Sequence, residues 1–319
     1  MKENRSFSEI FHGVKTELSK IIVGQDELVR DLFICLLCEG HALIEGVPGL
    51  GKTLIVRTLS QVLDLKYSRI QFTPDLMPAD ILGTHFINET EPGNRSFKFY
   101  KGPVFGQIIL ADEINRATPK TQSALLEAMQ EGQVTLFGEQ HTLEKPFIVL
   151  ATQNPLEMEG TYPLPEAQID RFLFKLMVQF PDREELFLIL DKTTEEYHAE
   201  LSPLLSAETI LELQPRIKQV PMASHVKEAA INILMATHPL NPLANEEVKA
   251  FVRFGASPRG LLSMVKAAKA RALLDGRHNV AMEDIKSVAK PALRHRIILN
   301  LKGIAEGISP DHIIDKIIQ

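Results

Sequence analysis

Residues 46–53 read Gly-Val-Pro-Gly-Leu-Gly-Lys-Thr, a complete GxxxxGK(S/T) phosphate-binding loop. An apolar run over residues 41–45 precedes the loop, and a helical pattern over residues 54–63 follows it. Glycines let backbone N–H groups converge on phosphate oxygens, and the helix adds its positive N-terminal end. The order of strand, loop and helix therefore predicts a nucleoside triphosphate ligand. A glycine-rich turn without chemical meaning is the alternative, and the readable strand and helix argue against it.

Two side chains of the loop have defined expected roles. The ammonium group of Lys52 would reach the β- and γ-phosphates, and the hydroxyl of Thr53 would hold Mg²⁺. The residues expected to contact the nucleotide here are Gly46, Val47, Pro48, Gly49, Leu50, Gly51, Lys52, Thr53 and Leu54.

Length and composition predict a globular chain with room for two domains. The 319 residues carry a net charge of −6, with 45% apolar and 24% charged residues, and a domain usually takes roughly 100 to 200 residues. No stretch approaches the roughly 18 apolar residues of a membrane span, and the N-terminus lacks a signal-peptide core. We expect a cytoplasmic protein without a membrane span, and the negative charge argues against a broad nucleic-acid-binding face.

The only two cysteines, Cys35 and Cys38, form a C-x-x-C pair inside an apolar segment. A closed zinc site needs four ligands, and no second pair or histidine cluster completes one. We interpret the pair as small residues on one face of a buried helix.

Up to about residue 180, short apolar runs alternate with helical patterns, which is typical of a parallel sheet covered by helices. The candidate strands are residues 42–45, 66–72, 108–111, 147–152 and 172–178. Turn residues also predict two inserted hairpins, over residues 81–100 and 133–143. From Pro181 onward the pattern is helical. We predict an α/β parallel-sheet core over residues 1–181, followed by a smaller all-helical lid domain over residues 182–319.

Polar residues follow two of the predicted strands. The run over residues 108–111 ends in Asp112-Glu113, and a parallel sheet presents such residues at its C-terminal edge, where ligands bind. Asp112 suits a Mg²⁺ ligand, and Glu113 suits a general base that polarises the attacking water. Asn154 follows the next strand and could orient that water. A solvated strand end and an ordinary turn asparagine before Pro155 are the alternatives.

Ser257-Pro258-Arg259-Gly260 opens a predicted helix of the second domain, with Ser257 as N-cap and Pro258 as first helical residue. Arg259 then lies in the first turn, where the helix dipole disfavours a cation by up to about 1 kcal/mol. A nearby anion would remove that conflict. The γ-phosphate of ATP is the candidate anion, and a plain surface arginine is the alternative.

These elements, in this order, resemble the AAA+ ATPases, and finer strings are similar to the MoxR family. The resemblance spans essentially the whole chain. Many NTPases share the phosphate loop, whereas the strings DEINRA and EAQIDRF are much narrower signals. The matching strings are IVGQ at residues 22–25, DEINRA at 112–117, TQNP at 152–155, EAQIDRF at 166–172 and SPR at 257–259.

The resemblance implies further site residues. Val23, Gly24 and Gln25 would line the adenine pocket. Asn154 would be the residue called sensor 1, and Arg259 would be sensor 2. Arg171 would be the arginine finger, which acts on the nucleotide of the neighbouring subunit, and an ion pair with Asp170 or Glu166 is the alternative for that side chain.

The resemblance also implies how the protein works. ATP and Mg²⁺ would be its cofactors, and the chains would form a ring, usually of six. The family resembles chaperones that remodel, mature or insert metal into partner proteins with a von Willebrand factor A domain, and the two hairpins are the expected client contacts. A magnesium-chelatase-like motor subunit is one alternative. A nucleotide-gated switch or scaffold without turnover is the other, and the intact Glu113 disfavours it.

Overall fold

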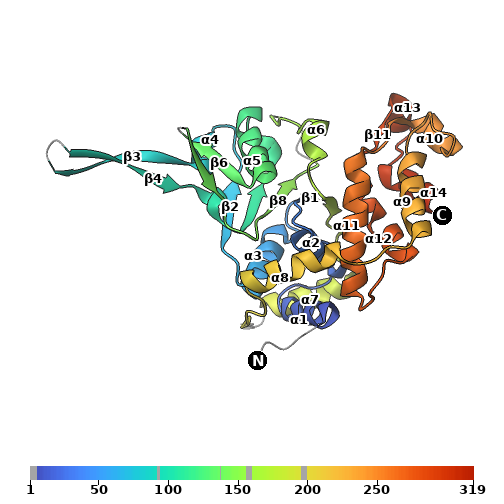
Figure 1. The fold of residues 1–319 in the computed structure, drawn as a ribbon, viewed down its shortest axis with the longest axis horizontal. Helices are drawn as coiled ribbons and strands as arrows, with labels where there is room; N and C mark the ends of the chain where they lie inside the picture. The colour runs from blue at the N-terminus through green and yellow to red at the C-terminus, as the bar shows by residue number, and fades with distance from the viewer. Residues whose placement is uncertain (1–5, 92–93, 137, 156–159, 195–199) are drawn as a thin grey trace.

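A central sheet of five parallel strands organises the first part of the chain (Figure 1). The computed structural model describes residues 6–91, 94–136, 138–155, 160–194 and 200–319. The strands are β1 (Ala42–Glu45), β2 (Tyr67–Gln71), β5 (Ile108–Asp112), β8 (Ile148–Gln153) and β9 (Phe174–Met177). They pair in the order β2-β5-β8-β1-β9. All five predicted strands are confirmed, and none of their ends differs from the predicted one by more than two residues.

The three inner strands, β5, β8 and β1, bury both faces of the sheet because they are apolar at most positions, whereas the edge strand β2 is mostly polar. In β1, Ala42 and Ile44 belong to one hydrophobic cluster and Leu43 belongs to the other. Successive side chains of a strand point to opposite faces, so the two clusters lie on the two sides of the sheet. The helices of the first cluster include α1 (Phe7–Ser19), α2 (Asp26–Leu37) and α3 (Lys52–Val62), and those of the second include α5 (Pro119–Glu131).

Both predicted hairpins are present, and their bases touch. The long hairpin pairs β3 (Gly83–Glu91) with β4 (Asn94–Lys101) and projects from the core, and the short one pairs β6 (Gln133–Leu136) with β7 (Glu139–Thr142) (Figure 1). The ring of Phe99 stacks on the ring of His141, with 4.3 Å between the ring centroids. This contact joins two insertions that lie far apart in the sequence.

Among its described residues, the chain after Pro181 is helical, as predicted, apart from one short antiparallel pair and an isolated parallel bridge between Met222 and Val280. Val252–Phe254 (β10) pairs with Ile298–Leu299 (β11), and strands this short are too brief to show a period of two in the sequence. The domain boundary at residues 181–182 stays a prediction. The helices are α7 (Arg183–Thr194), α8 (Ala207–Lys218), α9 (Ser224–Ala236), α10 (Glu246–Phe251), α11 (Pro258–Leu274), α12 (Met282–Leu293), α13 (Leu301–Ala305) and α14 (Pro310–Ile318).

These helices form two groups in space. Helix α7 contacts the end of α1, and α8 contacts α1 and α2, next to the core, whereas α9 to α14 gather on one side of it (Figure 1). Lys192 of α7 donates a hydrogen bond to the carbonyl of Ser19, and Gln214 of α8 donates one to the carbonyl of Leu36. We refer to residues 224–318 as the lid bundle.

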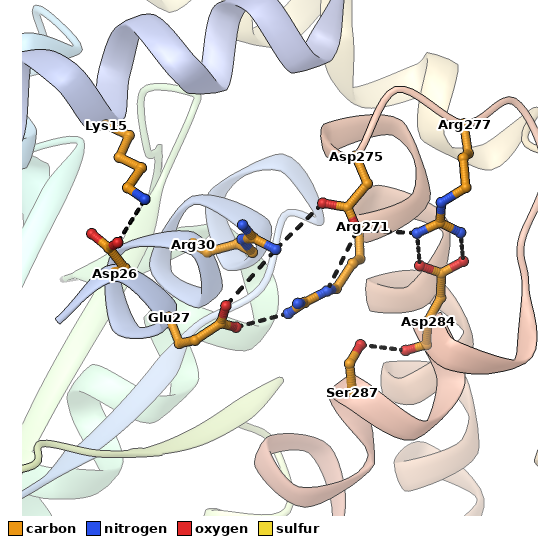
Figure 2. A network of polar contacts seen from close by, with 9 residues as sticks. All are labelled: Lys15, Asp26, Glu27, Arg30, Arg271, Asp275, Arg277, Asp284 and Ser287. Atoms are coloured by element: carbon orange, nitrogen blue, oxygen red, sulfur yellow. Dashed lines mark hydrogen bonds and ion pairs between the residues drawn. The ribbon is translucent and has the colours of Figure 1, made fainter.

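A charged network joins α2 of the core to α11 of the lid bundle (Figure 2). Arg30 lies 3.3 Å from Asp275, and Arg271 lies 2.9 Å from Glu27. Arg271 also approaches Asp275 of its own helix at 3.8 Å. Each segment thus supplies an arginine to a carboxylate of the other. Complementary charge therefore holds α2 against the end of α11, in addition to apolar packing.

The cysteine pair belongs to the core. Cys35 and Cys38 are buried free thiols, and burial raises the pKa of Cys38 to about 12. Among the described residues, His, Cys, Asp and Glu side chains form no group of three that could hold a metal ion. Within the same ranges, no helix has the length and apolar character that crossing a bilayer requires.

Candidate active site

The phosphate-binding loop lies at the C-terminal edge of the sheet, between β1 and α3. Gly49 and Gly51 have φ angles of 86° and 74°, which favour glycine. A Cβ added at either glycine would meet no atom within 4 Å, so the loop borders open space. The N-cap of α3, Gly51, has no side-chain capping bond. The loop therefore fits a phosphate chain, whose oxygens would accept from the free N–H groups of the helix start.

A mostly apolar cavity of about 320 Å³ adjoins this loop and fits a purine base. Val23 and Gln25 line the cavity, as do Leu50 and Leu54 of the loop and the first turn of α3. The left-handed backbone of Gln25, with φ of 61°, begins α2, and its side chain donates to the carbonyl of Gln179 at 2.9 Å. The opposite wall is formed by residues of α7 and the segment before it, namely Phe180, Pro181, Leu186, Ile189, Lys192 and Thr193.

Lys52 lies between the loop and the carboxylates of β5. Its ammonium group donates to the carbonyl of Gly46 at 2.5 Å. Burial lowers the pKa of Lys52, while the nearby carboxylates of Asp112 and Glu113 act in the opposite direction. The loop carbonyl therefore holds the ammonium group beside the space that the phosphates would fill.

Strand β8 lies between β1 and β5 and carries the residue that organises the carboxylates. Thr152 donates its hydroxyl hydrogen to Asp112 Oδ1 at 2.7 Å, and the same hydroxyl accepts from the backbone N–H of Glu113 at 2.9 Å. Asn154 directly follows the strand and is buried. The loop, both carboxylates and Asn154 thus meet at one edge, as the sequence predicts.

A second row of polar groups reaches the carboxylates from β2. Arg69 donates to Asp112 Oδ2 at 2.7 Å and to the side chain of Gln71 at 2.6 Å. Gln71 in turn donates to Glu113 Oε2 at 3.0 Å, and Arg116 donates to the same oxygen at 2.8 Å. Arg69, Gln71 and Arg116 were not predicted from the sequence. Arg69 and Gln71 are two apart on a strand and so share a face, and this spacing at a strand end is the signal that could have identified them.

The oxygen atoms present suit Mg²⁺ bound together with phosphate. Thr53 offers a hydroxyl, and Asp112 offers a carboxylate. Magnesium usually takes one or two protein oxygens and completes its shell with phosphates and water. A bound Mg²⁺ would neutralise charge on the phosphates, and it would compete with Arg69 for Asp112.

Arg171 and Arg259 lie at the opposite edge of the sheet. Both line a cavity of about 340 Å³ together with Gly40, His41 and Leu173, which precede β1 and β9. The four residues of β1 alone span about 13 Å at about 3.3 Å per residue. The structure therefore places the two arginines together and away from Lys52 of the same chain.

Arg171 has a different partner from the ion-pair alternative, whereas Arg259 is a surface arginine with 56% of its side chain exposed. Arg171 donates to the side chain of Gln130 of α5, while Asp170 accepts from other groups. Arg259 approaches Asp170 Oδ2 at 3.5 Å, so a carboxylate supplies the anion that its position in the first turn of α11 requires. Ser257 is the N-cap residue, as predicted, but its hydroxyl donates to Asp170 Oδ1 at 2.8 Å instead of capping the helix.

Comparisons with known proteins agree with this architecture. Residues 41–174 match the model of the ATPase family associated with various cellular activities (AAA), and residues 245–317 match an AAA lid domain. The chain is 43% identical to Chaperone MoxR1 of Mycobacterium tuberculosis, over 95% of this chain and 79% of that protein. It is 32% identical to protein MoxR of Methylorubrum extorquens, over 89% and 86% of the two chains. The chain belongs to the MoxR family of AAA+ ATPases.

A solved structure supports the same fold for this MoxR-family chain. A protein from Cytophaga hutchinsonii, named as a candidate ATPase, superposes with a TM-score of 0.90 at 42% identity, and the match covers 98% of this chain and 94% of the other. The parallel-sheet core and helical lid are therefore established for this chain, and nucleotide binding follows from its membership of the family.

At the edge where the strands begin, the MoxR-family chain buries a neutral histidine. His41 donates from Nε2 to the carbonyl of Met129 at 3.0 Å, and its Nδ1 accepts from the backbone N–H of Val149 at 3.0 Å. Burial lowers the pKa of His41 to about 4. The imidazole thus joins the end of α5, just before the short hairpin, to β8, the strand that Asn154 follows.

This burial makes stability depend on pH. Because the folded pKa of His41 lies below the unfolded value of about 6.5, the folded state binds fewer protons, and stability falls as pH drops from about 7 toward 4. Glutamine can accept and donate in the same places but does not titrate. We expect the free energy of unfolding of the natural protein, minus that of His41→Gln, to fall by about 1–2 kcal/mol between pH 7 and pH 5.

Urea titrations at the two pH values measure this difference. Asp31, whose pKa burial raises to about 7, and His295, whose pKa burial lowers, are present in both proteins and cancel. A difference that stays constant with pH would show that His41 is not buried in the neutral form.

Proposed function

We propose that this chain is a Mg²⁺-dependent ATPase that works as a ring, in which Arg171 and Arg259 of each subunit complete the nucleotide site of the next. The observation that carries the proposal is the separation of the two arginines from the loop and carboxylates of their own chain, at opposite edges of one sheet. An arginine that stabilises the transferred phosphoryl group must touch it. A neighbouring subunit, with its arginine edge facing this loop, would meet that need.

The chemistry follows from the groups at the C-terminal edge. A water oxygen would bond to the γ-phosphorus as the bond to the β–γ bridging oxygen breaks, and ADP would carry that electron pair away. Glu113 would accept the proton of the water, and Asn154 would orient it. Lys52 would hold the β- and γ-phosphates, and Thr152 would keep Asp112 and Glu113 in place.

Replacing the proposed general base separates a motor from a nucleotide-gated switch. Glu113→Gln should lower the steady ATPase rate by about 10²- to 10⁴-fold and leave the dissociation constant for ATP within a few-fold of its natural value. Phosphate release and fluorescent-nucleotide titration measure the two quantities. Glu228→Gln, at an exposed position of α9, is the control and should change neither. A natural protein that binds ATP but releases no phosphate in assembled form would favour the switch.

Mixing two inactive variants tests whether the arginine acts between subunits. The Arg171→Ala variant has an intact phosphate loop but lacks the arginine finger, and the Lys52→Ala variant has the arginine but lacks the loop lysine. Each variant alone should therefore lose about 10³-fold or more in ATPase rate. Mixed assemblies should recover activity, because a Lys52→Ala subunit can serve the intact loop of an Arg171→Ala neighbour. The double variant Lys52→Ala, Arg171→Ala is the matched control and should restore nothing. Mixed assemblies that form but stay inactive would contradict the proposal.

We further infer that the ATPase remodels, matures or inserts metal into a partner that carries a von Willebrand factor A domain. The support is similarity to a protein named as a chaperone and the projecting hairpin of β3 and β4, which is suited to reach a client (Figure 1). Affinity capture with Glu113→Gln should enrich such a partner with ATP present and lose it without ATP. Absence of any von Willebrand factor A domain protein from the ATP-dependent fraction would count against this client class.

A further inference from the structure

One carboxylate, that of Asp170, joins the core to the lid bundle next to the proposed arginine finger. Asp170 follows α6 (Glu166–Ile169) and immediately precedes Arg171. Its Oδ1 accepts from Arg296 Nε at 2.7 Å and from the hydroxyl of Ser257 at 2.8 Å, and its Oδ2 lies 3.5 Å from Arg259. The start of α11, which carries Arg259, and the segment that carries Arg171 are therefore attached to the same group.

Arg296 makes the larger part of this junction. Its side chain is only 2% exposed, and it follows α12 in the lid bundle. Besides the Asp170 carboxylate, its guanidinium donates to the carbonyls of Asp170 at 2.8 Å, Phe172 at 2.7 Å and Leu173 at 3.3 Å, and to that of Ala292. A guanidinium has five N–H donors, and all five are used here.

The acceptors of these hydrogen bonds indicate that Arg296 does more than pack the interior. Four of the five acceptors belong to residues 170–173, the segment that contains Arg171. Burying an ion pair gives little or no net stability compared with apolar packing, so an apolar side chain could close this contact at similar stability. An apolar side chain could not fix the peptide carbonyls of Asp170, Phe172 and Leu173. Displacing a reacting group by 1 Å can cost about 10²-fold in rate.

We propose that Arg296 is a positioning residue that fixes residues 170–173, so that Arg171 and, through Asp170, Arg259 are presented together to the nucleotide of the next subunit. The inference rests on the proposed function, in which both arginines act between subunits. In addition, the lid bundle of one chain would set the position of the arginines that act on the nucleotide of its neighbour. Arg296 itself touches neither nucleotide nor water.

Arg296→Lys tests this role, because lysine keeps the charge but cannot reach five fixed acceptors. The first mixture combines the double variant Lys52→Ala, Arg296→Lys, which supplies the arginines, with Arg171→Ala, which supplies the intact loop. The second mixture combines Lys52→Ala with the double variant Arg171→Ala, Arg296→Lys, so that the Arg296→Lys change lies on the subunit with the intact loop. We expect about a 10²-fold loss of recovered activity in the first mixture and recovery within about 2-fold of the parent pair in the second.

Arg294→Lys is the matched control. Arg294 is a largely buried arginine two residues away that contacts Asp311 and the carbonyl of Lys175, outside residues 170–173. It should support recovery on either subunit. A merely structural role for Arg296 would instead impair both mixtures equally and would also weaken ATP binding to the variant's own loop, measured with a fluorescent nucleotide.

Three outcomes separate the possibilities. Equal recovery in both Arg296→Lys mixtures, or equal loss in both, overturns the positioning role while the ring mechanism stands. Failure of the parent pair, Arg171→Ala with Lys52→Ala, overturns the proposed function itself. Where Arg296→Lys does not fold, Asp170→Asn takes its place, because it keeps the size of the side chain and removes the charge that Arg296 and Arg259 share. It should show the same loss confined to the arginine-supplying subunit.

Discussion

The polarity of the parallel sheet is the constraint on which the other features depend. All strand pairs of the central sheet run in one direction, with β8 between β1 and β5. Every residue that follows a strand therefore lies at one edge, and every residue that precedes a strand lies at the other. The phosphate loop, Asp112, Glu113 and Asn154 follow strands, whereas Arg171 precedes one. The loop and carboxylates of a single chain consequently lie at one edge of the sheet, and its Arg171 lies at the other.

Much of this arrangement could be predicted from the sequence because short-range rules fix it. The apolar runs of the five strands and the glycines of the loop determine local backbone structure, and the parallel order then brings Lys52, Asp112 and Asn154 together. Of the three residues expected at an adenine pocket, Val23 and Gln25 line the cavity beside the loop. Its wall from α7 was not predicted, because the exposed apolar residues of that helix carry no motif and face the cavity only after the chain folds back.

The remaining features depend on contacts between segments distant in sequence. Arg259 was expected near the γ-phosphate because its helix start disfavours a cation, and the structure supplies Asp170 as the compensating anion. Nothing local specifies which edge of the sheet the lid bundle covers. Arg296 was missed for a similar reason: its acceptors are mostly backbone carbonyls, which leave no pattern of residue types.

The stack of Phe99 on His141 has a mechanical consequence. The long hairpin is anchored in the chain before β5, and the short hairpin continues directly from α5, whose last turn holds the imidazole of His41 through the Met129 carbonyl. The long arm is thus joined to the short one, and the contacts continue through His41 to the strand that Asn154 follows. An aromatic contact of this kind contributes about 0.5–1.5 kcal/mol beyond its buried area, so opening the joint costs little beside the roughly 5–15 kcal/mol that holds a protein folded.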